Sequence, residues 1–134
     1  MQTGYVFLCN RAVMSECARN RRFSCSGKQV EAAQELKANT IIFLLNDETG
    51  TLMGPFTVAQ GPEDLVKGAW YSSVNKESFS GNIKVDWEEL HELKNAPEKI
   101  PFLRNTNECA LSVLQTQELL TELKKAPSYS DEKQ

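Results

Sequence analysis

The segment Thr40-Ile41-Ile42-Phe43-Leu44-Leu45 constrains the fold more strongly than any other part of the sequence. Its apolar residues follow one another without alternation, which is typical of a strand that is buried on both faces. The polar stretch from Asn46 to Gly50 follows directly and predicts a tight turn into a return strand through Leu52 to Val58. Other elements of the chain must therefore cover both faces of this hairpin.

Shorter patterns predict the elements around the hairpin. Residues 4–9 are apolar, aromatic and β-prone, and residues 83–87 alternate between apolar and charged side chains, so both stretches predict strands. Residues 12–20 carry apolar side chains at helical spacing, and residues 28–37 are rich in Ala, Glu, Lys and Gln, so both predict short helices. The stretch from Phe23 to Gly27 is polar apart from its aromatic residue, and it predicts a loop.

Two local signals refine this order of elements. Gly54-Pro55 inside the return strand predicts a bulge or an edge position, because proline cannot donate to the strand ladder. Ser112 and Gln115 have the spacing of a capping box ahead of a leucine-rich terminal helix, which Pro127 ends. The mixture of strands and helices predicts the α+β class.

The length of the chain bounds its organisation. Its 134 residues fit one domain, which we expect over residues 1–127, followed by a disordered polar tail over residues 128–134. No apolar run approaches the ~20 residues that a membrane span needs, and the N-terminus lacks the pattern of a secretory signal. We therefore expect a soluble cytoplasmic protein with no membrane partner.

The charge is distributed unevenly along the chain. The net charge is −3, which argues against non-specific binding to nucleic acid through a broad basic surface. Residues 1–40 carry six basic and three acidic groups, which gives +3 and leaves −6 for the remainder. An acidic total can therefore hide a local basic face.

Catalytic and metal-binding patterns are not evident in the sequence. The four cysteines form no C-x-x-C pair and His91 is the single histidine, so the usual zinc spacings cannot be written. We find no nucleophile elbow, phosphate loop or dinucleotide fingerprint. We expect no catalytic residue, no metal and no cofactor, and we expect His91 to be exposed beside Glu89 and Glu92, with Trp87 in the core.

Several short stretches together resemble the development and cell death (DCD) domain, over roughly residues 3–125. They are Gly4-Tyr5-Val6-Phe7-Leu8-Cys9-Asn10, Glu16-Cys17, Arg22-Phe23, the hairpin from Ile42 to Phe56, Ala69-Trp70 and the strand from Phe79 to Val85. The family usually follows its first helix with a Phe-Gly-Leu-Pro turn, where this chain has Phe23-Ser24-Cys25-Ser26. The resemblance therefore implies no role for residues Phe23 to Ser26 through that turn.

The resemblance implies a fold and a ligand class. DCD domains are similar to YTH and EVE domains, which share a PUA-like, strongly bent β-sheet or barrel with flanking helices. YTH domains bind a methylated base in an aromatic pocket, where an Asn follows the first strand and aromatic residues follow the first helix and the central hairpin. By order, these positions correspond to Asn10, Phe23 and Trp70.

A pocket of this kind would hold a base between aromatic faces and use an amide for its polar edge. Arginines near it could contact phosphates. The residues expected to bind the base are Asn10, Phe23, Ser24, Cys25, Trp70 and Tyr71, and those expected to contact phosphates are Arg11, Arg19, Arg21 and Arg22.

Each of these residues also has a structural interpretation. Phe23 and Trp70 could belong to the core, Asn10 could hold a turn through its side chain, and the arginines could form a solvated helix face. Two functions therefore remain open. The first is a non-enzymatic module that recognises RNA, DNA or a modified nucleotide, and the second is a protein-interaction module in stress or regulatory signalling.

Overall fold

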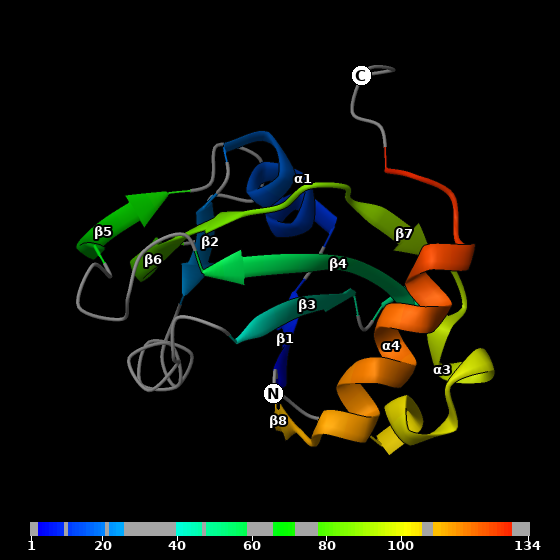
Figure 1. Ribbon diagram of the computed structural model, residues 1–134. Helices are drawn as coiled ribbons and strands as arrows, with labels where there is room; N and C mark the ends of the chain where they lie inside the picture. Colours follow the sequence, from blue (N-terminus) through cyan, green and yellow to red (C-terminus); the bar gives the residue numbers. More distant parts are fainter. Residues whose placement is uncertain are drawn as a thin grey trace.

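The structure of the protein is a computed structural model that describes residues 3–9, 11–20, 22–25, 40–46, 48–58, 66–71, 78–105 and 109–129 (Figure 1). Strands β2 (Arg22–Cys25), β5 (Val66–Tyr71) and the first part of β6 (Ser78–Asp86) are described here through their backbone pairing alone. The helix predicted over residues 28–37 lies outside the described residues.

A mixed, strongly bent sheet of eight strands forms the centre of the fold (Figure 1). Strands β1 (Gly4–Cys9) and β3 (Ile41–Asn46) run parallel, and β4 (Thr51–Val58) returns antiparallel to β3. The main path of the sheet is β2-β6-β4-β3-β1-β8, with β5 paired to β6 and β7 (His91–Leu93) paired to β4. The predicted α+β class with a PUA-like bent sheet and flanking helices is confirmed.

The remaining elements are helical segments that connect or cover this sheet, together with β8, the strand that pairs with β1. They are α1 (Arg11–Asn20), α3 (Ala96–Lys99), the 3-10 helix η2 (Pro101–Asn105), β8 (Cys109–Leu111) and α4 (Val113–Lys125). In the described part of the chain, no helix has the length and apolar character that a membrane crossing requires.

Strand β3 is buried along its whole length, as its sequence predicts. Ile42 and Leu44 pack into a cluster that includes Met14 and Cys17 of α1, whereas Ile41, Phe43 and Leu45 pack into a second cluster with α4. Leu119 and Leu123, on the apolar face of α4, pack into the second cluster. The two helices therefore cover opposite faces of one strand (Figure 1).

The β3–β4 hairpin has the turn and the bulge that the sequence predicts. The Asn46 side-chain oxygen accepts hydrogen bonds from the backbone N–H groups of Glu48 at 3.0 Å and Thr49 at 3.3 Å. Gly50 adopts a φ of 75°, which favours glycine. The register shifts where Gly54 and Pro55 together lie opposite the single residue Phe43, so β4 bends at that point.

Two expectations from the sequence were wrong, and a third, that Trp87 lies in the core, was met only in part. Residues 22–25 form the edge strand β2 rather than a loop, because a strand with one unpaired side tolerates a polar composition. His91 is only 7 % exposed, because it lies in β7 under the chain that follows α4. Trp87 lies beyond the end of β6 and is only half-buried, with its ring edge-to-face with Phe56 at 5.5 Å.

The chain remains paired beyond the expected domain end at residue 127. Ser128 forms a bridge with His91, and the Tyr129 N–H donates to the Leu90 carbonyl at 2.8 Å. Tyr129 also packs against the cluster on the α1 side. Residues 130–134 of the predicted tail lie outside the described residues.

Helix α4 depends on a complete capping box. The Gln115 N–H donates to the Ser112 hydroxyl at 3.1 Å, and the Ser112 N–H donates to the Gln115 side-chain oxygen at 3.0 Å. We expect Ser112→Ala to lower the free energy of unfolding by about 1 kcal/mol, measured by urea denaturation. Ser112→Thr keeps the hydroxyl and should retain most of the stability. Equal losses in the two variants would contradict a capping role.

Candidate functional site

The aromatic positions predicted to hold a base lie on two strands that flank β6. Phe23 of β2 pairs with Ile83, and Trp70 of β5 pairs with Phe79. These two partners are four residues apart on β6, or about 13 Å along an extended strand. Within the same strands, Ser24 pairs with Asn82, Cys25 with Gly81 and Tyr71 with Ser78.

The backbone thus brings five of the six predicted base-binding positions to one part of the sheet. Asn10 lies outside the described residues, so its position relative to β2 and β5 stays a prediction. That Phe23 and Trp70 form an aromatic pocket also stays a prediction, because the structure describes β2 and β5 through their backbone pairing.

The predicted phosphate contacts are spread along α1 and β2. Arg11 begins α1 and Arg19 lies in its last turn, about 12 Å further along the axis, and both are exposed. Arg22 begins β2, and Arg21 lies outside the described residues. The two arginines of α1 therefore do not share one phosphate.

Arg11 lines a small polar pocket of about 330 Å³ at the ends of β1 and β3. The pocket holds a second cation, Lys94, one carboxylate, Glu92, and the hydroxyl of Thr49, which donates to Thr51 at 3.0 Å. Among the described residues, its lining is Arg11, Met14, Asn46, Thr49, Thr51, Glu92, Lys94 and Asn95. We call it the Arg11 pocket.

The chemistry of the Arg11 pocket suits an oxyanion. The first turn of α1 contains no acidic residue, so the positive end of the helix dipole is not neutralised within the helix. The guanidinium of Arg11 and the ammonium of Lys94 are both hydrogen-bond donors to phosphate oxygens. The sequence did not predict Lys94 as part of this pocket. Lys94 directly follows β7, and the pairing of β7 with β4 places it there.

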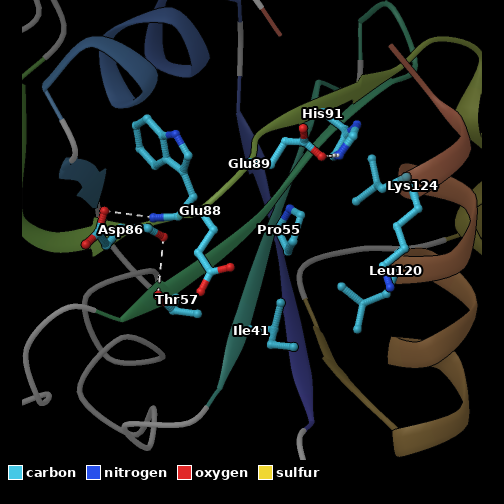
Figure 2. Close-up of a pocket in the computed structure, with 11 residues that line it drawn as sticks. Ile41, Pro55, Thr57, Asp86, Glu88, Glu89, His91, Leu120 and Lys124 are labelled. Atoms are coloured by element: carbon cyan, nitrogen blue, oxygen red, sulfur yellow. Dashed lines mark hydrogen bonds and ion pairs between the residues drawn. The ribbon is translucent and has the colours of Figure 1, made fainter. Parts of the chain in front are cut away.

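A larger pocket of about 550 Å³ lies between α4 and strands β3, β4 and β6 (Figure 2). None of the described residues that line it was predicted to bind a base or a phosphate. Its lining is Ile41, Pro55, Thr57, Asp86, Trp87, Glu88, Glu89, His91, Leu120, Leu123 and Lys124. We call it the acidic groove, since it contains three carboxylates and one lysine.

His91 closes one end of the acidic groove and is held by two acceptors. Its Nδ1 lies 3.0 Å from the Ala126 carbonyl, and its Nε2 lies 2.8 Å from the Glu89 carboxylate (Figure 2). Each ring nitrogen of His91 therefore has a hydrogen-bond partner. His91 therefore links β7 to the segment that leaves α4.

The comparisons with known proteins identify the family. The family model described as the development and cell death domain matches residues 3–121. The chain belongs to the DCD domain family. The resemblance in the sequence is thereby confirmed for most of the chain.

Solved structures show that this DCD domain has the fold of YTH domains. A crystal structure of the Mmi1 YTH domain superimposes with a TM-score of 0.70 at 13 % identity, covering 92 % of this chain and 96 % of that one. The Mmi1 YTH domain in a crystal structure with RNA gives a TM-score of 0.69 at 11 % identity, covering 92 % and 79 %. No protein of curated function matches the sequence significantly.

The residues that this structure describes contain no cluster of three His, Cys, Asp or Glu side chains that could hold a metal ion.

The role of His91 can be tested by removing its hydrogen bonds. We expect His91→Leu to lower the free energy of unfolding by about 1–2 kcal/mol, because it leaves the Ala126 carbonyl without its donor. Amide exchange at Glu92 and Tyr129 should accelerate, since both N–H groups bond across this junction. Glu89→Gln is the matched control, because the Glu89 side chain is 68 % exposed and its loss should have little effect. Unchanged exchange in His91→Leu would refute the link.

Proposed function

We propose that this DCD domain is a non-enzymatic module that binds RNA or another single-stranded nucleic acid. The observation that carries the proposal is the Arg11 pocket, in which two cations and several hydroxyl and amide groups meet at the start of α1. The fold supports the same ligand class, because it is shared with the Mmi1 YTH domain, which has been solved in complex with RNA.

In this proposal the Arg11 pocket holds a backbone phosphate. Arg11 is exposed and lines the pocket, so its guanidinium is positioned to donate to a phosphate. Lys94 is exposed as well and adds a second positive charge. Phosphate contacts of this kind fix the position of a strand rather than its sequence.

Residues on β2 and β5, the strands that flank β6, would contact a base next to that phosphate. Phe23 and Trp70 are proposed to stack on bases, each contact contributing about 1–3 kcal/mol. Asn10, Ser24, Cys25 and Tyr71 would provide polar and edge contacts, and Arg19, Arg21 and Arg22 further phosphate contacts. This assignment combines the β2–β6–β5 register with the order of residues in the sequence.

The proposal contains no catalytic step. Both ring nitrogens of the single histidine, His91, already face the Ala126 carbonyl and the Glu89 carboxylate. A histidine held in this way is not placed to activate a nucleophile.

Charge reversal in the Arg11 pocket tests the phosphate contact. We expect Arg11→Glu and Lys94→Glu each to weaken binding of a fluorescein-labelled 12-nucleotide RNA by about ten-fold, measured by fluorescence anisotropy. Each should also reduce the slope of log K against log salt by about 0.7. Lys125→Glu, an exposed charge reversal on α4 outside this pocket, controls for net charge. An equal loss in Lys125→Glu would contradict a specific site.

Tryptophan fluorescence tests the aromatic contact separately, because the chain has two tryptophans. In a Trp87→Phe variant Trp70 is the sole reporter, and RNA should quench its emission in a saturable way. Trp70→Ala should abolish the quenching and weaken binding by about 1–3 kcal/mol, the contribution of one stacked base. Quenching that disappears in Trp87→Phe and persists in Trp70→Ala would place the RNA elsewhere.

A further inference from the structure

We infer that the acidic groove is a docking site for a basic peptide segment of another protein, one that carries a lysine or arginine next to an aliphatic side chain. This inference is independent of the proposed RNA binding, because the groove shares no residue with the Arg11 pocket. The two proposed ligands also differ in charge, since the peptide is positive and RNA is negative.

The floor and one wall of the groove are apolar. Ile41 of β3 and Leu123 of α4 are almost completely buried beneath it, and the half-buried Leu120 and Pro55 line its sides (Figure 2). A volume of about 550 Å³ exceeds that of one amino-acid side chain and falls within the range of small ligand sites. An aliphatic side chain of a partner can therefore be buried there.

The rim of the groove selects a positive partner. Among the described residues of the rim, Asp86, Glu88 and Glu89 place three carboxylates on the β6–β7 side, whereas Lys124 is the lysine on the α4 side. Glu88 is exposed and has no ion-pair partner within the described residues. A basic peptide segment has the positive charge that complements these carboxylates.

Trp87 lies among these carboxylates and lines the groove as well. A guanidinium or ammonium group is attracted to the face of an indole ring, most strongly where carboxylates lie nearby. Trp87 is held against Phe56 in an edge-to-face contact at 5.5 Å, so its ring is positioned in advance. An arginine of the partner can therefore meet both an aromatic face and a carboxylate.

A second cavity extends the site along the same segment of chain. It has a volume of about 430 Å³ and shares Trp87, Glu88 and Glu89 with the acidic groove, while Leu90 and Tyr129 line its other side. The two cavities lie on either side of residues 87–89. An extended segment of several residues fits them better than a single small cation, because it can place side chains in both.

The test uses three fluorescein-labelled eight-residue peptides and the whole domain. The first has a Leu-Val pair flanked by arginines, the second replaces the arginines with glutamates, and the third replaces Leu-Val with serines. We expect the first peptide to bind at least about ten-fold more tightly than either of the others, by fluorescence anisotropy. The Trp87 indole N–H should shift in a ¹⁵N NMR titration with the first peptide only.

Variants of Glu88 locate the binding site. Glu88→Lys should weaken binding of the first peptide by about ten-fold and Glu88→Gln by less. The matched control is Glu118→Lys, an equal charge reversal at an exposed position of α4 outside the groove, which should leave binding within about two-fold. Melting curves establish that the variants are folded, as expected for exposed side chains.

Three outcomes would overturn the inference. They are equal affinity for the arginine and glutamate peptides, insensitivity to Glu88→Lys, and absence of any binding at millimolar peptide. Sedimentation of the free domain as a dimer that Glu88→Lys dissociates would also overturn it, because the groove would then be occupied by a second copy of the chain.

Discussion

The burial of β3 on both faces is the constraint on which the rest of the structure depends. Apolar residues follow one another along this strand, so the two sets of side chains need separate partners, and α1 and α4 provide them on opposite sides. Parallel pairing of β1 with β3 requires a crossover, which places the start of α1 at the ends of both strands. Both candidate sites follow from this arrangement, since the Arg11 pocket lies at one end of the β3–β4 hairpin and the acidic groove contains Ile41 and Thr57 at the other.

The elements that could be predicted from the sequence are those specified by nearby residues. The hairpin turn depends on Asn46 and Gly50, and the start of α4 depends on Ser112 and Gln115, so each signal lies within five residues of the chain. The errors concern residues whose partners lie far away. His91 is buried because it contacts Ala126, 35 residues later, and β2 is a strand because β6 pairs with it. A pattern read along one segment contains no information about such partners.

The same limit applies to the candidate sites. The order of residues predicted Arg11 as a phosphate contact, but it did not predict Lys94, Asn46 and Thr49 beside it. These residues come from the turn after β7, from β3 and from the turn after β3. The acidic groove was missed altogether, although Glu88 and Glu89 are conspicuous in the sequence. In the sequence alone, acidic residues near a tryptophan indicate a solvated surface. The groove becomes evident only when the apolar side chains of α4 are seen to line it together with these residues.

The basic and acidic residues of the chain are separated both along the sequence and in the fold. The first 40 residues carry +3 and the remainder −6, and the fold places Arg11 at one end of the hairpin and Glu88 near the other. Ile41 and Asn46, which line the two sites, are separated by about 17 Å along β3. This distance exceeds the screening length of roughly 8 Å at physiological salt. An anionic strand and a basic peptide could therefore occupy one DCD domain together, each without neutralising the surface that the other requires.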